Sequence, residues 1–214
     1  MEHSSWNEAL AALEHFCGIA DEEWRRLQAN LPVEALLRAA RLIEDARSCG
    51  GRLHFSGIGK ASYVAAYCAS LFSSTGTPGY VLHGTEATHG SCGQLLSRDI
   101  VVLISNSGKT EELLRTAAAV RAMGCRIIAV TGNLHSPLAQ CASLTLHAPI
   151  QREGGPLGRA PRMSVIAQIY TLMAISVILQ SRVGQTPEQY LRCHPGGTLG
   201  KSGTGIAPDF SSAL

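Results

Sequence analysis

The 214-residue chain has few charged residues and few aromatic ones, which make up 16% and 5% of it. Neither sign of charge dominates, because 18 lysines and arginines stand against 16 aspartates and glutamates. A nucleic-acid-binding domain usually carries a strongly basic surface, so this balance argues against DNA or RNA as a partner. The hydrophobic fraction of 45% is that of a folded domain. Because aromatic residues are scarce, small apolar residues must build its core.

The sequence also lacks cysteine pairs, a signal peptide and an apolar run of membrane length. Its seven cysteines are scattered and form no C-x-x-C motif, which argues against a zinc ribbon or a redox dithiol and favours free thiols in a reducing compartment. The N-terminus shows no basic segment followed by an apolar one. The longest apolar stretch, Val165 to Leu179, is interrupted by Gln168 and Ser176 and is too short to cross a bilayer. These absences predict a soluble, cytoplasmic protein without a membrane partner.

The residues that are present predict a helical start and then alternating strands and helices. Apolar residues at helical spacing predict helices over 21–30 and 33–47, separated by Pro32. The run 100–104 is apolar at every position, as a strand covered on both faces must be. The remaining patterns predict strands at 52–56, 79–83, 100–105, 126–131 and 143–148, and helices at 60–75, 110–123, 136–140, 164–182 and 187–193. We therefore expect an α/β fold with a doubly wound, five-stranded parallel sheet flanked by helices.

A single domain fits this pattern, since the sequence shows no internal repeat. We expect an N-terminal helical segment over 1–31, the α/β domain over 32–200, and a flexible tail over 201–214 that contains Gly, Ser and Pro. The predicted helix at 164–182 is apolar around most of its circumference, and one domain of this size is too small to bury it on every side. This predicts a homo-oligomer.

Ligands of such folds bind at the carboxyl ends of the strands. The first strand runs into Ser56-Gly57-Ile58-Gly59-Lys60. Its two glycines allow the backbone to approach an anion, and the following helix offers free N–H groups. The loop has neither the Walker A spacing nor a complete dinucleotide fingerprint. Tight-turn glycines beside a surface lysine would explain it equally well.

A second loop, Ser105-Asn106-Ser107-Gly108-Lys109-Thr110, follows the most apolar strand and brings three hydroxyl groups to the start of a helix. Hydroxyl donors suit a sugar phosphate better than a triphosphate, which usually needs Mg²⁺ ligands as well. The alternative is that Thr110 is only the N-cap of the helix. Capping, however, uses one hydroxyl group and not three.

These two loops resemble those of the SIS (sugar isomerase) domain. Further segments resemble the arabinose-5-phosphate isomerases: Thr75–Pro78, His83–Gly90, Thr131–Asn133, Ser136–Ala139, Arg152-Glu153 ahead of Pro156-Leu157 and Ala160-Pro161, and His194–Gly200. That family is known for a tetrameric SIS domain that interconverts D-ribulose 5-phosphate and D-arabinose 5-phosphate, on the path to the lipopolysaccharide sugar Kdo. Its longer members continue into a pair of CBS domains. This chain has fourteen residues after Gly200 and resembles the short members.

The resemblance implies roles for particular residues. The positions implicated in catalysis are Lys60, Glu112, Glu153 and His194. The positions that contact substrate are Ser56, Gly76, Thr77, His83, His89, Ser105, Ser107 and Thr110, of which Ser56, Ser105, Ser107 and Thr110 hold the phosphate. His83 also falls on a position reported to bind inhibitory zinc, a metal that activity does not require, and no cofactor is implied. In an oligomer, His194 of one subunit would complete the site of a neighbour.

Some of these residues are also compatible with simpler roles. Glu153 beside Arg152 is compatible with a surface ion pair. His83, Glu86 and His89 have a spacing that suggests a metal site, but further ligands are missing. The sequence also departs from the family: Ser91 replaces the aspartate of H-G-D, Lys109 stands where many SIS loops carry glutamate, and Arg162-Met163-Ser164 replaces a Thr-Ser-Ser run. These departures bear on the substrate more than on the type of reaction.

Aldose–ketose isomerisation moves a proton between C1 and C2 through a cis-enediol, and it needs a base, an acid and stabilisation of charge. A carboxylate, an imidazole and a lysine supply these functions. The sequence therefore predicts a phosphosugar isomerase that interconverts D-ribulose 5-phosphate and D-arabinose 5-phosphate as a homo-tetramer. Two alternatives stay open. One is a non-catalytic SIS sensor of sugar phosphates, which needs the hydroxyl loop but not all four catalytic residues; the other is an SIS isomerase for a hexulose or heptulose phosphate.

Overall fold

The computed structural model describes residues 5–196, so the predicted tail and the closing motif from Gly197 onward lie outside the described residues. Five parallel strands form one sheet in the order β2-β1-β3-β4-β5. They are β1 Leu53–Gly57, β2 Gly79–Val81, β3 Ile100–Ile104, β4 Arg126–Thr131 and β5 Leu144–His147. The prediction of a five-stranded parallel sheet is confirmed.

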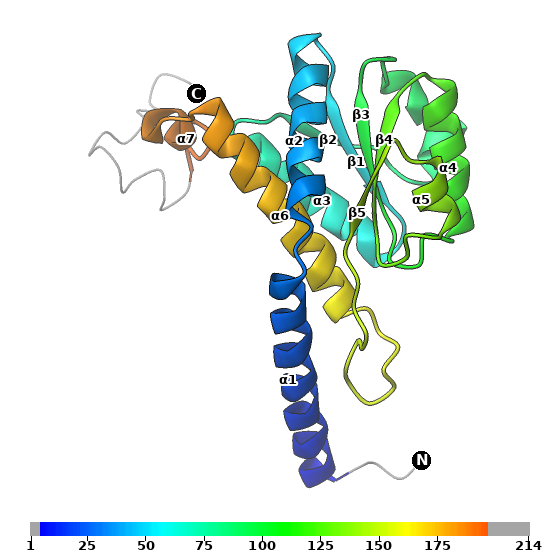
Figure 1. The fold of residues 1–214 in the computed structure, drawn as a ribbon, viewed down its shortest axis with the longest axis vertical. Helices are drawn as coiled ribbons and strands as arrows, with labels where there is room; N and C mark the ends of the chain where they lie inside the picture. The colour runs from blue at the N-terminus through cyan, green and yellow to red at the C-terminus, as the bar shows by residue number, and fades with distance from the viewer. Residues whose placement is uncertain (1–4, 197–214) are drawn as a thin grey trace.

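Helices cover both faces of this sheet (Figure 1). One face carries α2 Val33–Ser48, α3 Lys60–Ser74 and α6 Met163–Val183. The other carries α4 Glu111–Ala122 and α5 Pro137–Cys141, together with the short 3-10 helices η1 Glu86–His89 and η2 Ser91–Gln94. The last element described is α7, Pro187–Arg192, which follows α6.

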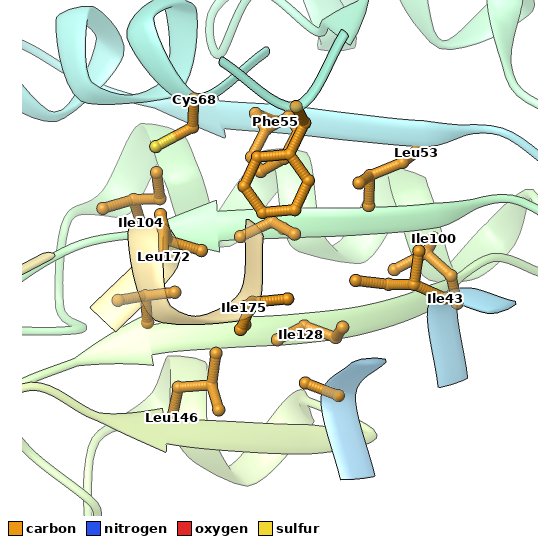
Figure 2. Packing of buried hydrophobic residues seen from close by; sticks show 14 of the residues in the cluster. Ile43, Leu53, Phe55, Cys68, Ile100, Ile104, Ile128, Leu146, Leu172 and Ile175 are labelled. Carbon is orange, nitrogen blue, oxygen red and sulfur yellow. The ribbon is translucent and has the colours of Figure 1, made fainter. Parts of the chain in front are cut away.

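The continuous apolar run of β3 is explained by a core on each side of the sheet. Ile100, Val102 and Ile104 face α2, α3 and α6. Val101 and Leu103, which alternate with them, face α4 and α5. Figure 2 shows Leu172 and Ile175 of α6 packed over the sheet in the first of these cores. Each large side chain buried in this way stabilises the fold by about 1.5–3 kcal/mol. The sheet thereby holds the start of α6 in a fixed place relative to the carboxyl ends of the strands.

Helix α1, Trp6–Ala29, is longer than the predicted helix over 21–30 and projects away from the rest of the domain (Figure 1). It begins earlier because Ser5 and Glu8 form a capping box, which satisfies free N–H groups at its start. Its last turns attach it to the domain: Leu27 enters the core, and buried Glu23 accepts a hydrogen bond from Gln151 N at 3.0 Å. The projecting part exposes large apolar side chains, namely Trp6, Leu10 and Leu13.

Helix α6 is the only helix among residues 5–196 that is long and apolar enough to cross a membrane, with a mean hydropathy of 1.7. Half of its most apolar stretch is buried inside the fold, as in the core helix of a folded domain. Its outer side still exposes Ile166, Met173 and Val177. One chain therefore does not cover α6 on every side.

A buried carboxylate fastens the amino-terminal edge of the sheet. Asp99 accepts hydrogen bonds from Leu96 N at 2.9 Å and from the Arg52 backbone and guanidinium at 2.8 and 3.0 Å, and His54 Nε2 lies 3.1 Å from it. Burial alone would raise the pKa of Asp99, but these hydrogen bonds and the Arg52 charge lower it below its usual value. Burial lowers the pKa of His54, and the opposing effect of Asp99 is smaller. His54 is therefore neutral near pH 7.

We expect Asp99→Asn to lower the free energy of unfolding by about 1–3 kcal/mol at neutral pH, because the amide leaves buried donors poorly paired. The stabilisation from Asp99 and His54 is complete above their ordinary pKa values of 3.8 and 6.5 and is lost as the pH falls below them, since both folded values are lowered. Denaturant unfolding measures the free energy of unfolding of both proteins. The difference between parent and variant should become smaller below pH 3.8. Asp45→Asn, at an exposed position of α2, should change stability by no more than about 0.5 kcal/mol. An Asp99→Asn variant as stable as the parent would contradict the prediction.

Candidate active site

The site lies where the strand order changes direction. From β1 the chain continues to β2 on one side of the sheet and then returns to β3 on the other side of β1. The loops that follow β1 and β3 therefore separate, and ligands of open α/β sheets bind at such a switch point. A cavity of about 300 Å³ opens there, lined by the loops after β1 and β3 and by the approach to α6. This volume is at the lower end of the range of roughly 300–1,000 Å³ that small-molecule sites occupy.

The loop after β1 brings Lys60 to the cavity. A Cβ at Gly57 would lie 2.6 Å from Ala61 O, so only glycine allows this close approach between the strand and α3. Helix α3 begins at Lys60, whose side chain lines the cavity. In the part of the chain that is described, no carboxylate forms an ion pair with it. Lys60 is therefore available to a ligand.

The loop after β3 presents the predicted hydroxyl groups to the same cavity. Ser105 Oγ lies 3.2 Å from Thr110 Oγ1 and accepts a hydrogen bond from Gly108 N at 3.1 Å. Ser107 Oγ accepts one from Lys109 N at 3.2 Å. Thr110 holds the N-cap position of α4, yet its side chain makes no capping hydrogen bond. Capping therefore does not account for this hydroxyl group, and a phosphate remains a suitable partner for it.

Glu153, in the segment between β5 and α6, borders the cavity on a third side. Its Oε2 accepts hydrogen bonds from Arg162 N at 2.7 Å and Ser164 N at 3.0 Å. The carboxylate thus caps a helix whose own N-cap side chain makes no such bond, and the positive end of the helix dipole favours its charge. Among the described residues no hydrogen bond reaches Glu153 Oε1. Arg152 pairs with Glu22 instead, so the alternative of an Arg152–Glu153 ion pair is wrong.

The cavity brings together five of the predicted site residues: Lys60, Ser105, Ser107, Thr110 and Glu153. It also contains polar residues to which the sequence analysis assigned no role in the site: Asn106, Arg159, Ser164 and Gln168. Arg159 is exposed and has no ion-pair partner among residues 5–196. Two cations against one carboxylate give the cavity a positive balance, which favours an anionic ligand. In the sequence, Arg159 could have been noticed from its place directly before Ala160-Pro161, which resembles the isomerases.

Four other predicted residues lie at this edge of the sheet but do not line the cavity. Ser56 is fully buried, and Glu112 is exposed in the first turn of α4. His83 lines a neighbouring hollow of about 350 Å³, where its Nδ1 accepts a hydrogen bond from Glu86 N at 3.3 Å, and His89 is exposed at the end of η1. Across the described residues, no group of three His, Cys, Asp or Glu side chains is placed to hold a metal ion. A zinc-binding role for His83 stays a prediction.

Gly76, Thr77 and His194 lie far from the cavity in the same chain. Gly76 and Thr77 follow α3, whose 15 residues carry the chain about 22 Å away from Lys60. Gly76 packs near Val183 at the end of α6, and Figure 1 shows α7, which precedes His194, at that same end. The 21 residues of α6 span about 30 Å, so His194 does not reach the cavity at the other end of the helix. The chain thus carries two sets of predicted site residues, one near each end of α6.

Comparison with known proteins relates the whole domain to one family. Residues 47–178 match the family model of the SIS domain. Over 151 residues the chain is 36% identical to arabinose 5-phosphate isomerase KdsD of Pseudomonas aeruginosa, which covers 71% of this chain and 46% of the relative. Over 179 residues it is 35% identical to arabinose 5-phosphate isomerase GutQ of Salmonella typhimurium, covering 84% and 54%. The chain therefore spans about half the length of the curated relatives it matches.

A solved structure matches over its full length. Protein c3406 of Escherichia coli CFT073, solved in complex with arabinose 5-phosphate, superposes with a TM-score of 0.79 at 33% sequence identity. The match covers 90% of this chain and 100% of the other.

Proposed function

The chain belongs to the SIS domain family and is similar to its arabinose 5-phosphate isomerases, and on that premise we propose that it is a phosphosugar aldose–ketose isomerase. The reaction proposed is the interconversion of D-ribulose 5-phosphate and D-arabinose 5-phosphate through a cis-enediol. One observation carries the proposal: a single cavity holds a loop of hydroxyl groups, a lysine, and a carboxylate, and within residues 5–196 the lysine has no ion-pair partner and one carboxylate oxygen accepts no hydrogen bond. The relatives' names and the sugar phosphate bound in the matching structure support the choice of sugar.

The proposal assigns a task to each group. Ser105, Ser107 and Thr110 donate hydrogen bonds to the phosphate, which places the other end of the sugar toward Glu153. The Glu153 carboxylate takes the proton from one carbon and returns it to the next, while its hydrogen bonds to α6 hold it in position. Lys60 stabilises the negative charge of the enediolate. His194 acts as the acid–base partner at the sugar oxygens, and it must come from another copy of the chain.

The assembly proposed is therefore a homo-tetramer in which the two ends of neighbouring chains meet. It is supported by the separation of His194, Gly76 and Thr77 from the cavity, since one chain alone leaves the site incomplete. It is also supported by the apolar side chains that α1 and α6 expose. Burial of such a surface drives association. We also place the enzyme in the cytoplasm, with a sugar phosphate as its small-molecule partner and a role in the supply of Kdo.

A panel of sugar phosphates tests the function. The purified protein is incubated in ²H₂O with pentose, hexose and heptose phosphates, and products and C2 exchange are read by NMR. We expect conversion of D-arabinose 5-phosphate to D-ribulose 5-phosphate with deuterium at C1 of the ketose, and deuterium at C2 of the arabinose 5-phosphate that the reverse reaction forms again. Turnover of only a hexose or heptose phosphate would change the substrate and keep the reaction. Binding of a sugar phosphate without hydrogen exchange would overturn the proposed isomerase activity and favour a sensor of sugar phosphates.

The hydroxyl loop gives a second prediction. Ser105→Ala together with Ser107→Ala should raise KM by about tenfold or more and also reduce kcat, because the phosphate positions the reacting carbons. Initial rates with D-arabinose 5-phosphate measure both constants. Ser97→Ala, an exposed serine before β3, serves as a control and should leave them unchanged. Unchanged kinetics in the double variant would remove this loop from the phosphate site.

A further inference from the structure

Gln168 is a buried polar side chain that lines the cavity. Only 3% of it is exposed, and its buried Oε1 has no hydrogen-bond partner among the residues that the structure describes. Residues 5–196 contain three other buried side-chain atoms in this condition, on Arg52, His54 and Ser56. None of those residues lines the cavity, whereas Gln168 does.

The position of Gln168 on α6 places it at the floor of the cavity. Ser164, Val165 and Gln168 of α6 all line it, at the spacing that puts residues on one face of a helix. Gln168 lies one turn, about 6 Å, beyond Ser164, whose N–H holds Glu153. One further turn along, Leu172 is already packed in the apolar core (Figure 2). Gln168 is thus, among the residues of α6 that line the cavity, the polar one furthest along the helix.

An unpaired amide oxygen in such a place is unfavourable. Leaving a buried acceptor without a donor costs about 1–3 kcal/mol, and buried polar groups in folded proteins are nearly always paired. The buried hydroxyl groups further along α6 follow this rule. Thr171 Oγ1 donates to Ala167 O at 2.8 Å, and Ser176 Oγ lies 3.1 Å from Thr75 Oγ1. The exception at Gln168 coincides with the cavity, where a ligand can supply the missing donor.

The chemistry of the amide indicates which part of a ligand it binds. Oε1 is an acceptor and needs an O–H or N–H donor. A phosphate dianion offers only acceptors, but a sugar hydroxyl group is both donor and acceptor and satisfies the amide in either orientation. We propose that Gln168 is a substrate-binding residue that pairs with a hydroxyl group of the sugar and so selects its chain length and configuration. This inference rests on the proposed function, since it assigns one more group to the same site.

The test compares two ligands that differ only by the sugar. Gln168→Met keeps the length of the side chain and removes both hydrogen-bonding groups, and Gln168→Leu is a second apolar variant. Calorimetry should show that each binds arabinose 5-phosphate about tenfold more weakly, which corresponds to one hydrogen bond, with inorganic phosphate affinity within about twofold of the parent. Without ligand, the melting temperature of Gln168→Met should not fall, because the variant removes an unpaired polar group. Thr171→Val, one turn further and outside the cavity, should bind both ligands as the parent does.

Each result separates the inference from its alternatives. Unchanged affinity for arabinose 5-phosphate would mean that Gln168 does not bind the substrate. An equal loss of affinity for both ligands would mean that the substitution acts through the hydroxyl loop or through folding. Either result overturns the inference. Isomerisation by the parent together with such a result would leave the proposed function intact. If the parent binds arabinose 5-phosphate without isomerising any sugar phosphate, the proposed function fails and the comparison of affinities still decides the role of Gln168.

Discussion

Replacing Glu153 by glutamine is expected to reduce kcat by roughly 10²–10⁴-fold, because the amide does not take a proton from the sugar carbon. The amide oxygen still accepts hydrogen bonds from Arg162 N and Ser164 N, so α6 keeps its cap and the melting temperature stays near that of the parent. Initial rates and C2 exchange in ²H₂O measure the loss. Affinity for inorganic phosphate, which does not depend on the carboxylate, confirms that the cavity is intact.

Glu111→Gln is the matched control for this experiment. Glu111 is an exposed carboxylate on α4 that pairs with Arg115, so its replacement should leave kcat within about twofold of the parent. If Glu153→Gln isomerises as fast as the parent, Glu153 is not the proton-transfer group, and the exposed Glu112 is the next carboxylate to test. If the melting temperature falls together with kcat, the loss is due to the cap and not to the proton transfer.

His194→Ala is expected to reduce kcat by a similar factor, roughly 10²–10⁴-fold, and the loss should be reversed by a second inactive variant. When Glu153→Gln and His194→Ala chains are dissociated, mixed and reassembled, about a quarter of the shared sites regain both native residues. The activity of the mixture should approach that fraction of the parent's. Recovery of this kind requires that Glu153 and His194 of one site belong to different chains.

The control for this recovery is a mixture of two variants whose substitutions both lie in the cavity. Glu153→Gln and the Ser105→Ala, Ser107→Ala double variant affect the same cavity, so every site in their mixture keeps one defect and no activity should be gained. Sedimentation of the parent provides an independent check, and a monomer at micromolar concentration would contradict the shared site. So would a His194→Ala mixture that gains nothing while the parent is oligomeric.

Much of the fold was predictable because its strands carry strong local signals. A strand covered on both faces needs apolar residues at successive positions, and 100–104 meets this requirement. The predicted strand 126–131 coincides with β4. Within the helical segment expected over 1–31, a helix was predicted only from residue 21, although Ser5 and Glu8 have the spacing of a capping box.

The site was predictable only in part. Ser105 and Ser107 follow a buried strand, and this local pattern is sufficient to place them at the edge where ligands bind. The distance between Glu153 and His194 depends instead on the length and direction of α6, which no local pattern contains. Gln168 was read as an interruption of an apolar run, since a sequence shows that a residue is polar but not whether its oxygen is paired in the fold.

The length of α6 has a consequence for how this protein can change over evolution. Its first turn is capped by Glu153, and its last turn leads to α7 and His194, so the helix sets both the spacing and the relative rotation of the two proposed half-sites. One residue inserted into it would turn everything beyond by about 100° and move it by about 1.5 Å. Substitutions on its outer face leave the length and rotation of the helix untouched, although polar ones at Ile166, Met173 or Val177 would alter the apolar surface proposed for assembly. The helix is therefore open to changes of side chain but closed to insertions and deletions, which are tolerated in loops at the surface.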